Sequence, residues 1–213
     1  MKKKLLILIL IGFTLTSCYS QKKIDVKEKQ FEQKIDTIVE ELKFNYEFDQ
    51  ALREYIIYKT FDKAVTDSIE NLENEKGRQN YIFSRNFKSD LAKRIWKEFI
   101  HPSDDKFTER LIAISDSVGY PSLKRIKKYY KTDLPEEFNP TIFFVHSREK
   151  YWEKINEIAE REFKNGNMGK CDYGYIRWHT SGRKENKYLD ENGIKYVANS
   201  KGRAVYIQTC EDE

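Results

Sequence analysis

His146 is the residue whose position in the sequence most favours chemistry. It follows the apolar run Ile142–Val145, and histidine is the side chain that titrates near neutral pH. If the fold places His146 against Asp49 or Arg53 in a cleft, the imidazole could act as a general base or contact a ligand. The alternative is a half-buried histidine that bonds a backbone carbonyl or caps the following helix. We favour this structural interpretation, because buried polar groups are normally hydrogen-bonded within the fold.

Asp49 and Arg53 form a charged pair with a spacing of four residues. Side chains four apart lie on one face of a helix, where such a pair contributes about 0.2–0.5 kcal/mol to helix stability. We favour that structural role. A guanidinium held by an aspartate could also present its two parallel donors to a carboxylate or a phosphate.

His179 belongs to a second polar segment, Trp178–Arg183. This segment combines an aromatic ring, two hydroxyls and the guanidinium of Arg183 beside a predicted turn, so it could line a polar pocket. We prefer to interpret it as an ordinary helix end with Gly182 as the stop. His146, Asp49, Arg53, His179 and Arg183 together make up the candidate pocket.

His101, Asp104 and Asp105 are three neighbouring side chains that could bind a metal ion, but we interpret the two carboxylates as charges at a helix start. The chain has three histidines and no His-x-x-x-His or Cys-x-x-Cys spacing, so we predict no metal and no cofactor. A nucleophile elbow, a P-loop and a dinucleotide fingerprint are also absent from the sequence, which argues against an enzyme. A carboxylate pair for glycoside hydrolysis stays open, because spatial separation is not visible in a sequence.

Several short motifs resemble those of an uncharacterised bacterial domain family that often occurs in secreted proteins. They are an Asp-Gln-x-x-Arg element at 49–53, the turn Gly119-Tyr120-Pro121, a histidine that ends an apolar segment, His146, and the late arginine, Arg183. The resemblance covers about residues 38–183 and implies no activity. The sequence departs from the family pattern where Gly182 precedes Arg183 in place of an aspartate, and in its C-terminal strands.

The first eighteen residues resemble a bacterial lipoprotein signal. Lys2, Lys3 and Lys4 precede the mostly apolar run Leu5–Leu15, and the segment ends in Leu-Thr-Ser-Cys at Cys18. The run is about half of the roughly 20 apolar residues that span a bilayer, and its length suits a secretory signal. The resemblance implies cleavage before Cys18, a diacylglycerol on its sulfur and a fatty acid such as palmitate on the new amine. Two or more acyl chains anchor a protein stably.

The predicted anchor also gives an address. Tyr19 is not the aspartate that marks many inner-membrane lipoproteins, and no acidic cluster follows Cys18. We therefore expect a cell-envelope protein in the outer membrane that faces the periplasm. Residues 18–24 would form a tether of at most about 20 Å, which keeps the domain close to the bilayer.

The net charge of +4 overstates how basic the mature chain is. Lys2, Lys3 and Lys4 lie in the predicted signal, which holds no acidic residue, so 36 basic and 35 acidic side chains remain. A balanced chain without a concentrated basic block argues against nucleic acid as a partner. We interpret the run 124–128 (Lys-Arg-Ile-Lys-Lys) as the solvated face of a short helix.

Cys171 and Cys210 are the cysteines that remain after the predicted cleavage. A translocated protein meets oxidising conditions, in which such a pair often forms a disulfide. Closing a loop of about forty residues would contribute about 4 kcal/mol on the chain-entropy model. The alternative is two separately buried thiols.

Apolar periodicity predicts a chain of helices from about residue 25. Phe31, Ile35, Ile38 and Leu42 form one apolar stripe, and Asp49 is placed near the start of a second helix with Phe48, Leu52, Tyr55 and Ile56. Further helices are expected over 61–77, over 91–99 closed by Pro102, from Ser103 as a cap to Gly119, over 123–130 with Ser122 as a cap, and over 151–163. Residues 141–145 fit either a helix or a buried strand.

The pattern changes near the C-terminus. The short runs 188–189, 194–197 and 204–209 are rich in β-forming residues and are separated by turns at Asn192-Gly193 and Lys201-Gly202. The predicted fold class is α+β, mainly α: a helical body with a small C-terminal antiparallel β-meander. Residues 25–213 are predicted to form a single globular domain.

These features predict a membrane-anchored envelope lipoprotein with a non-catalytic domain that binds a protein or another envelope component. One alternative is a hydrolase-like envelope enzyme that uses His146 and His179 with acidic partners. Another is an immunity-type lipoprotein that neutralises a toxin.

Overall fold

The computed structural model describes residues 2–72, 76–80, 90–135, 137–198 and 204–208, with side-chain surroundings from residue 26 to residue 195 within those ranges. Its elements, in chain order, are α1 (Lys2–Tyr58), α2 (Lys63–Glu70), α4 (Asp90–Ile95), the π-helix η1 (Trp96–Ile100), α5 (His101–Val118), α6 (Leu123–Tyr129), α7 (Thr141–Val145), the 3₁₀-helix η2 (Glu149–Tyr151), α8 (Trp152–Lys164), α9 (Lys170–Thr180), α10 (Lys187–Asp190), β1 (Ile194–Ala198) and β2 (Ala204–Gln208). The described residues are mainly helical, as the sequence predicts.

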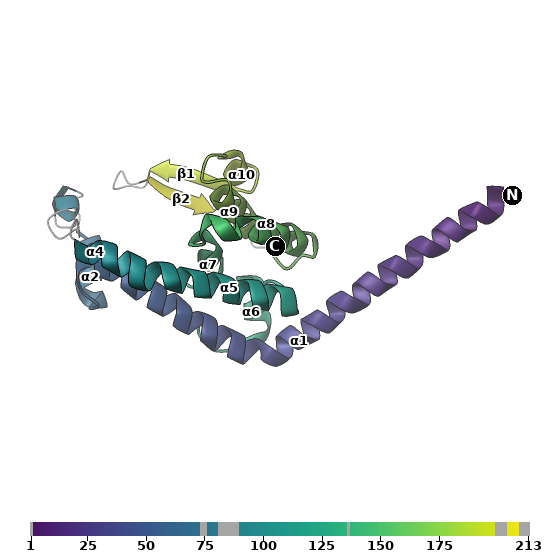
Figure 1. The fold of residues 1–213 in the computed structure, drawn as a ribbon, viewed down its shortest axis with the longest axis horizontal. Helices are drawn as coiled ribbons and strands as arrows, with labels where there is room; N and C mark the ends of the chain where they lie inside the picture. Colours follow the sequence, from purple (N-terminus) through teal and green to yellow (C-terminus); the bar gives the residue numbers. More distant parts are fainter. Residues whose placement is uncertain (1, 73–75, 81–89, 136, 199–203, 209–213) are drawn as a thin grey trace.

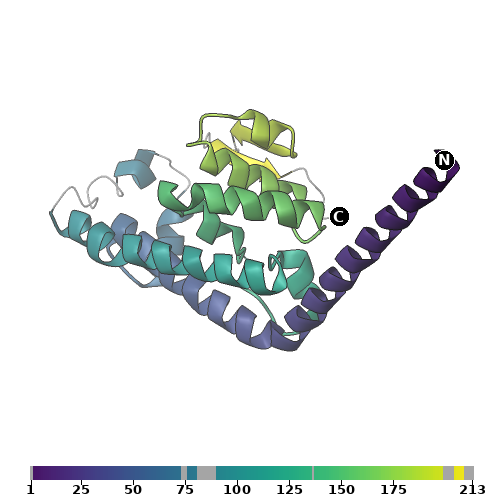
Figure 2. The same cartoon turned by 45° about the vertical axis from the view of Figure 1, so that its right-hand side comes forward.

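The helices form two layers joined by α7. In one layer the C-terminal half of α1 lies alongside α5, and in the other α8 packs against α9 (Figures 1 and 2). The short helix α7 contacts both α5 and α9 and so lies between the layers. Elements far apart in the sequence therefore meet around α7.

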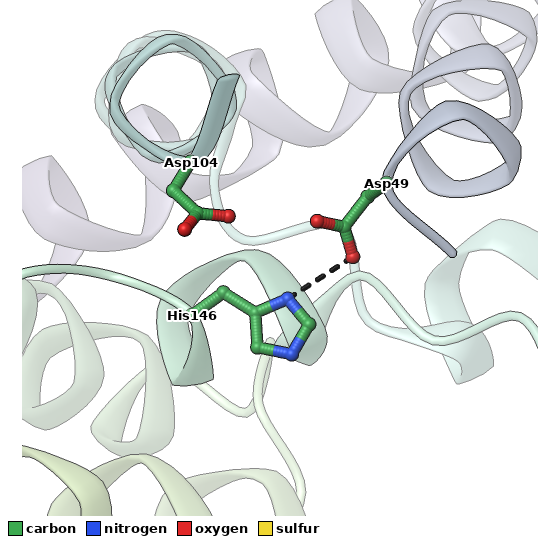
Figure 3. Close-up of side chains that lie close together, drawn as sticks. All are labelled: Asp49, Asp104 and His146. Carbon is green, nitrogen blue, oxygen red and sulfur yellow. Dashed lines mark ion pairs between the residues drawn. The ribbon is translucent and has the colours of Figure 1, made fainter. Parts of the chain in front are cut away.

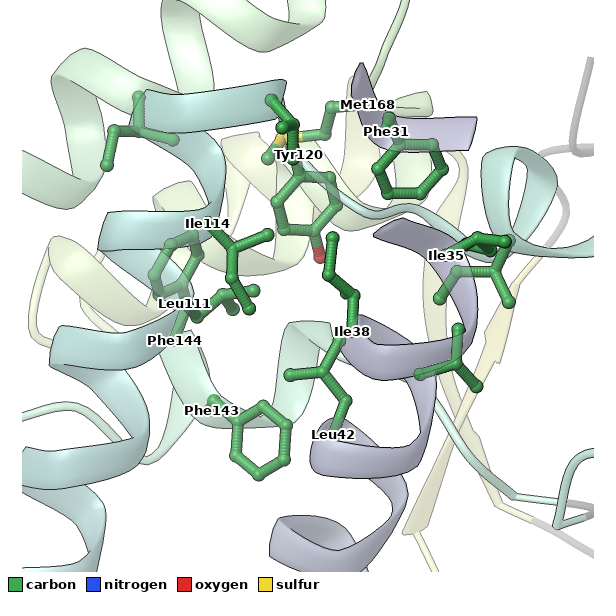
Figure 4. Close-up of a cluster of buried hydrophobic side chains, with 14 of the residues drawn as sticks. Phe31, Ile35, Ile38, Leu42, Leu111, Ile114, Tyr120, Phe143, Phe144 and Met168 are labelled. Carbon is green, nitrogen blue, oxygen red and sulfur yellow. The ribbon is translucent and has the colours of Figure 1, made fainter. Parts of the chain in front are cut away.

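The main core fills the space between α1, α5, α7 and α8. The predicted stripe of Phe31, Ile35, Ile38 and Leu42 is buried on α1 and belongs to the same cluster as Leu111 and Ile114 of α5 and Phe143 and Phe144 of α7 (Figure 4). Burying each of these side chains contributes roughly 1.5–3 kcal/mol. Hydrophobic burial on this face fixes α1, α5 and α7 relative to one another.

The prediction of a separate helix that starts near Asp49 was wrong. Helix α1 continues to Tyr58 without interruption, because no glycine or proline breaks the chain between Leu42 and Asp49. Ile56 of the predicted face is buried, but the face begins one residue later than expected. Phe48 is 40% exposed, whereas Asp49 is 3% exposed.

The predicted helix end at Pro102 and the Ser103 cap were also wrong. α4, η1 and α5 follow one another without a break, and the N–H of His101 bonds the carbonyl of Trp96 five residues earlier. Pro102 is the second residue of α5 and follows the π turn directly, and as a proline it has no N–H with which to bond a carbonyl of the preceding turn. The wider π turn joins the two α-helices, and such turns are frequent at functional sites.

Other helices agree with the sequence. Ser122 caps α6 and accepts the N–H of Arg125, α8 covers the predicted segment 151–163, and residues 141–145 form helix α7 in place of a strand. The solvated role of Arg125 was wrong, because this side chain is 6% exposed. Its guanidinium donates to the carbonyls of Tyr120 and Val118 and to Glu28.

Within the described residues, the C-terminal segment holds less β-structure than the predicted meander. Tyr188 and Leu189, which we expected in a strand, lie in α10. β1 and β2 pair antiparallel, with Ile194 opposite Gln208 and Ala198 opposite Ala204. The described residues thus contain a two-stranded sheet, and the predicted turn at Lys201-Gly202 lies outside them.

The predicted signal and tether fall in the N-terminal part of α1, which extends away from the helical body in both views (Figures 1 and 2). Within the part of the chain that the structure describes, no helix carries an apolar stretch long enough to cross a bilayer. Cleavage and lipidation at Cys18 stay predictions.

Candidate functional site

Four charged or titratable side chains from three elements meet at one point between the layers. Asp49 and Arg53 come from α1, Asp104 from α5, and His146 from the C-terminal end of α7. We call Asp49, Arg53, Asp104 and His146 the acid–histidine cluster. In Figure 3 the carboxylates of Asp49 and Asp104 and the ring of His146 point toward one another.

α1 presents Asp49 because its buried stripe continues past the apolar residues. After Leu42, steps of three and four residues reach Asn45 and Asp49, which are 8% and 3% exposed. The same face that packs into the core therefore turns polar along the helix. Arg53 follows four residues later and donates Nε–H to Asp49 Oδ1 at 2.9 Å, as the sequence spacing predicted.

Asp104 is the residue of the cluster that the candidate pocket lacked. It is 5% exposed and begins a buried stripe on α5 that continues through Thr108 and Leu111. The steps of four and three residues between Asp104, Thr108 and Leu111 in the sequence could have indicated that Asp104 is buried. Pro102 and Ser103 instead indicated a helix start, at which Asp104 would act as a capping charge.

His146 is held by the short helix α7. Its backbone N–H bonds the Ile142 carbonyl at 2.8 Å, and the Thr108 hydroxyl of α5 bonds the Phe143 carbonyl at 3.0 Å. The side chain is 18% exposed, and its Nδ1 lies 3.1 Å from Asp49 Oδ2. That distance suits an ion pair, although Nδ1 has no aligned hydrogen-bond partner. The ring thus faces a carboxylate and not the backbone carbonyl that we expected.

Arg53 joins the two carboxylates. Its Nη2 donates to Asp104 Oδ1, its Nε to Asp49 Oδ1, and its guanidinium lies over the ring of Trp96, 5.3 Å from the centroid. Gln50 donates to Asp49 Oδ2 at 2.8 Å. With both aspartates ionised, two carboxylates face one guanidinium in a largely desolvated place, and the excess negative charge is costly unless a proton or a cation compensates it.

The pKa values of Asp49 and Asp104 are shifted in opposite directions. Burial acts to raise the pKa of Asp49, but the contacts with His146 and Arg53 outweigh it and hold the pKa below its ordinary value. For Asp104, burial and the neighbouring Asp49 carboxylate outweigh Arg53, and the pKa is raised. Two acids whose environments separate their pKa values are typical of acid–base sites.

His179 and Arg183 do not join the cluster. His179 is 7% exposed on α9, and its Nε2 bonds the carbonyl of Ser147, the residue after His146, at 3.0 Å. Burial lowers the pKa of His179. Arg183 is exposed, with its guanidinium over the ring of Trp178. Through this hydrogen bond, His179 helps to hold the backbone of Ser147, the residue next to His146.

The arrangement can hold a cation or move a proton. One oxygen or nitrogen each from Asp49, Asp104 and His146 lie within 4.8 Å of one another, a grouping that the spacing of the sequence did not suggest. Asp49 can also orient the imidazole, which is the geometry of a general base. The hydroxyl of the adjacent Ser147 donates to the Phe144 carbonyl at 2.6 Å and is therefore not presented as a nucleophile.

A small cavity adjoins the cluster. It has a volume of about 280 Å³ and is lined by Gln50, Tyr46, Asn139, Thr141 and Asp172, among others. Gln50 belongs to both places, because it lines the cavity and donates to Asp49. Gln50 therefore links the lining of this cavity to the acid–histidine cluster.

No family model, curated protein or solved structure matches the chain. The resemblance to an uncharacterised bacterial family therefore stays a prediction. Of its motifs, Asp49, Arg53 and His146 meet in the cluster. The Gly119-Tyr120-Pro121 turn lies elsewhere, with the Tyr120 N–H bonded to Glu162 at 3.0 Å.

Proposed function

We propose that this protein is a lipid-anchored envelope protein whose helical domain binds a small cationic or hydrogen-bond-donating ligand at the acid–histidine cluster. The lipobox-like ending at Cys18 supports the anchor. The observation that carries the binding role is the meeting of Asp49, Arg53, Asp104 and His146 from three separate elements. An outer-membrane position that faces the periplasm remains part of the proposal.

The charge of the cluster selects the class of ligand. Arg53 already pairs with both carboxylates, so its single positive charge is outweighed there and the cluster disfavours a phosphate or a carboxylate ligand. The two aspartates, by contrast, keep oxygens that can accept from a donor or contact a cation. A positively charged or donor-rich ligand would supply the compensating charge that the buried carboxylates lack.

A thermal-shift screen of the full-length, untagged protein in detergent tests this proposal. We expect an organic cation such as spermidine, an amino sugar such as glucosamine, or a divalent metal ion to raise the Tm by several degrees at concentrations far above its Kd. The increase should be absent in Asp104→Asn and unchanged in Glu47→Gln, an exposed carboxylate on α1. If no probe raises the Tm, or if Asp104→Asn responds like the wild type, the binding role is wrong.

An acid–base enzyme is the second candidate. The contact of His146 Nδ1 with Asp49 and the opposite pKa shifts of Asp49 and Asp104 favour it. His179 would have no catalytic part, because its Nε2 is bonded to a backbone carbonyl. Hydrolysis of ester or glycoside substrates that is lost in His146→Gln but retained in His179→Gln would favour this candidate over a binding protein.

A further inference from the structure

We propose that the acid–histidine cluster is a binding site for one divalent transition-metal ion, such as Zn²⁺ or Mn²⁺, with Asp49, Asp104 and His146 as its ligands. This inference rests on the proposed binding function and names its ligand. The three side chains offer two carboxylates and one imidazole, and their ligand atoms lie within 4.8 Å of one another. Figure 3 shows them directed toward a common point.

The distances are close to those of a coordination shell. With metal–ligand bonds of about 2.0–2.2 Å, neighbouring ligand atoms are separated by about 3.0–3.5 Å. Asp49 Oδ2 and His146 Nδ1 are already 3.1 Å apart. The ligand atom of Asp104, on the facing helix, lies within 4.8 Å of the other two, so a shift of roughly 1–2 Å would bring it to a coordination distance.

His146 supplies a second, independent observation. Its Nδ1 is buried and lies 3.1 Å from Asp49 Oδ2 without the alignment of a hydrogen bond, although buried polar atoms are nearly always satisfied. Neutral imidazole nitrogen is a common ligand for transition metals. Coordination would give this atom a partner in the direction of the two carboxylates.

Arg53 and Gln50 divide the carboxylate oxygens in a way that suits a metal. Arg53 donates to Oδ1 of Asp49 and to Oδ1 of Asp104, which leaves Oδ2 of each aspartate for the ion. Gln50 donates to one lone pair of Asp49 Oδ2 and leaves the other. Hydrogen-bonded partners of this kind orient the ligands of metal sites, so Arg53 is a positioning residue.

The donor set favours transition metals over magnesium and calcium. Mg²⁺ and Ca²⁺ prefer oxygen ligands alone, whereas a mixed carboxylate and imidazole set suits zinc, iron, manganese and nickel. Three protein ligands leave room for a further ligand. His101 lies on this side, with Nδ1 3.9 Å from Asp104 Oδ2 and its side chain 47% exposed.

Calorimetric titration of the full-length, untagged protein with ZnCl₂ and MnCl₂ after chelator treatment tests the site. We expect about one ion per chain, and weak or no binding of Mg²⁺ and Ca²⁺. Asp104→Asn and His146→Gln should abolish the stoichiometric binding, and Arg53→Lys should weaken it about tenfold or more. Asp105→Asn is the matched control, because its carboxylate is adjacent on α5 but bonds Arg148 and Lys150.

A Co²⁺ absorption spectrum gives a readout that does not depend on stability. Visible bands that appear in the wild type and in Asp105→Asn, but not in His146→Gln, would support nitrogen coordination. Circular dichroism shows whether each variant is folded. The metal site would be overturned if the wild type showed no stoichiometric binding. It would also be overturned if Asp104→Asn and His146→Gln bound the metal with the affinity of the wild type.

The outcome also separates this inference from the broader function. If spermidine or glucosamine stabilises the wild type through Asp104 while Zn²⁺ and Mn²⁺ do not bind, the metal site is wrong and the binding role stands. If none of these probes binds, both proposals fail.

Discussion

Asp49 and Asp104 share a single guanidinium, so the charge state of each aspartate depends on its neighbours more than on solvent. Asp49 is 3% exposed and accepts hydrogen bonds from Arg53 and Gln50. A buried group in that position stabilises the fold only while it stays charged and bonded. Single substitutions in the cluster therefore have effects that change with pH.

Asp49→Asn is expected to lower the free energy of unfolding at pH 7 by about 1–3 kcal/mol. The amide keeps the shape of the side chain but weakens the acceptor for Arg53 and removes the charge beside His146. Because the folded-state pKa of Asp49 is lowered, its stabilising contribution is present above the unfolded pKa of about 3.9 and is lost as the pH falls through the folded value. Chemical denaturation of both proteins at several pH values measures this difference.

The difference between wild type and Asp49→Asn should thus shrink below about pH 4. Glu47→Gln, an exposed carboxylate two residues away on α1, is the control and should stay within about 0.5 kcal/mol of the wild type. A difference that is constant from neutral to acidic pH would show that Asp49 is not charged in the folded state at pH 7.

His179→Gln is expected to make the stability less sensitive to mild acid. Burial lowers the folded-state pKa of His179, so this group stabilises the fold above the unfolded pKa of about 6.5 and loses that contribution as the pH falls through the lower folded value. A glutamine amide can replace Nε2 as the donor to the Ser147 carbonyl but does not titrate. Urea denaturation from pH 7 to pH 5 should show a smaller loss of stability in the variant, and an identical loss would contradict the assignment.

Some of the individual residues of the candidate site could be predicted from the sequence. Asp49 and Arg53 share a helix face through their spacing, and His146 stood out because it follows an apolar run. The sequence offered a meeting of these three residues as one possibility but could not decide it, because the meeting depends on how α1 and α7 pack. The burial of Asp104 was not predicted. An aspartate can lie at an exposed helix start or in a buried ion pair, and Pro102 indicated a helix start.

Among the elements, α7 decides where His146 lies, and it has only five residues. A helix of that length is not stable by itself, so contacts with α5 and the core hold it. The Thr108 hydroxyl bond to the Phe143 carbonyl is one of these contacts, and it is fully buried.

Thr108→Val should therefore lower the free energy of unfolding by about 1–3 kcal/mol and also weaken ligand or metal binding at His146. The valine fills the space but leaves the Phe143 carbonyl without its donor. Ser115→Ala on the same helix is the control. Its hydroxyl is equally buried but bonds the Leu111 carbonyl of its own helix, so its loss should leave binding unchanged. Denaturation and calorimetric titration test both effects, and a Thr108→Val protein that is destabilised but binds normally would contradict the link to His146.

The helices themselves were predictable where an apolar stripe is long and regular, as in Phe31–Leu42 and Ile155–Phe163. The residues at which the helices begin and end were harder to predict. Pro102 was expected to end a helix, but a π turn before it lets the helix continue. Tyr188 and Leu189 favour strands by residue type, yet tertiary contacts of α10 with α9 and β1 decide for a helix.

At the scale of the whole molecule, one covalent link is expected between distant parts of the chain. Cys171 is buried at the start of α9, and Cys210, two residues after the end of β2, lies outside the described residues. Peptide mapping by mass spectrometry without reductant should find a Cys171–Cys210 cross-linked peptide. Its loss in Cys210→Ser should lower stability by about 4 kcal/mol on the chain-entropy model, and two free thiols in protein isolated from the envelope would contradict the prediction.

The lipid anchor is the prediction that determines where the binding site operates. Cys18→Ala removes the sulfur that the lipid requires, so the variant should lose labelling with radioactive palmitate and leave the membrane fraction for the soluble fraction or remain as an uncleaved precursor. Glu47→Gln is the control and should stay labelled and membrane-bound, because this exposed carboxylate on α1 has no part in the predicted lipid attachment. If the Cys18→Ala protein were still membrane-bound after cleavage, the attachment would have to come from the domain itself. If Cys18 carries two or more acyl chains, as the sequence predicts, these chains are enough for stable attachment and would hold the acid–histidine cluster near the membrane surface.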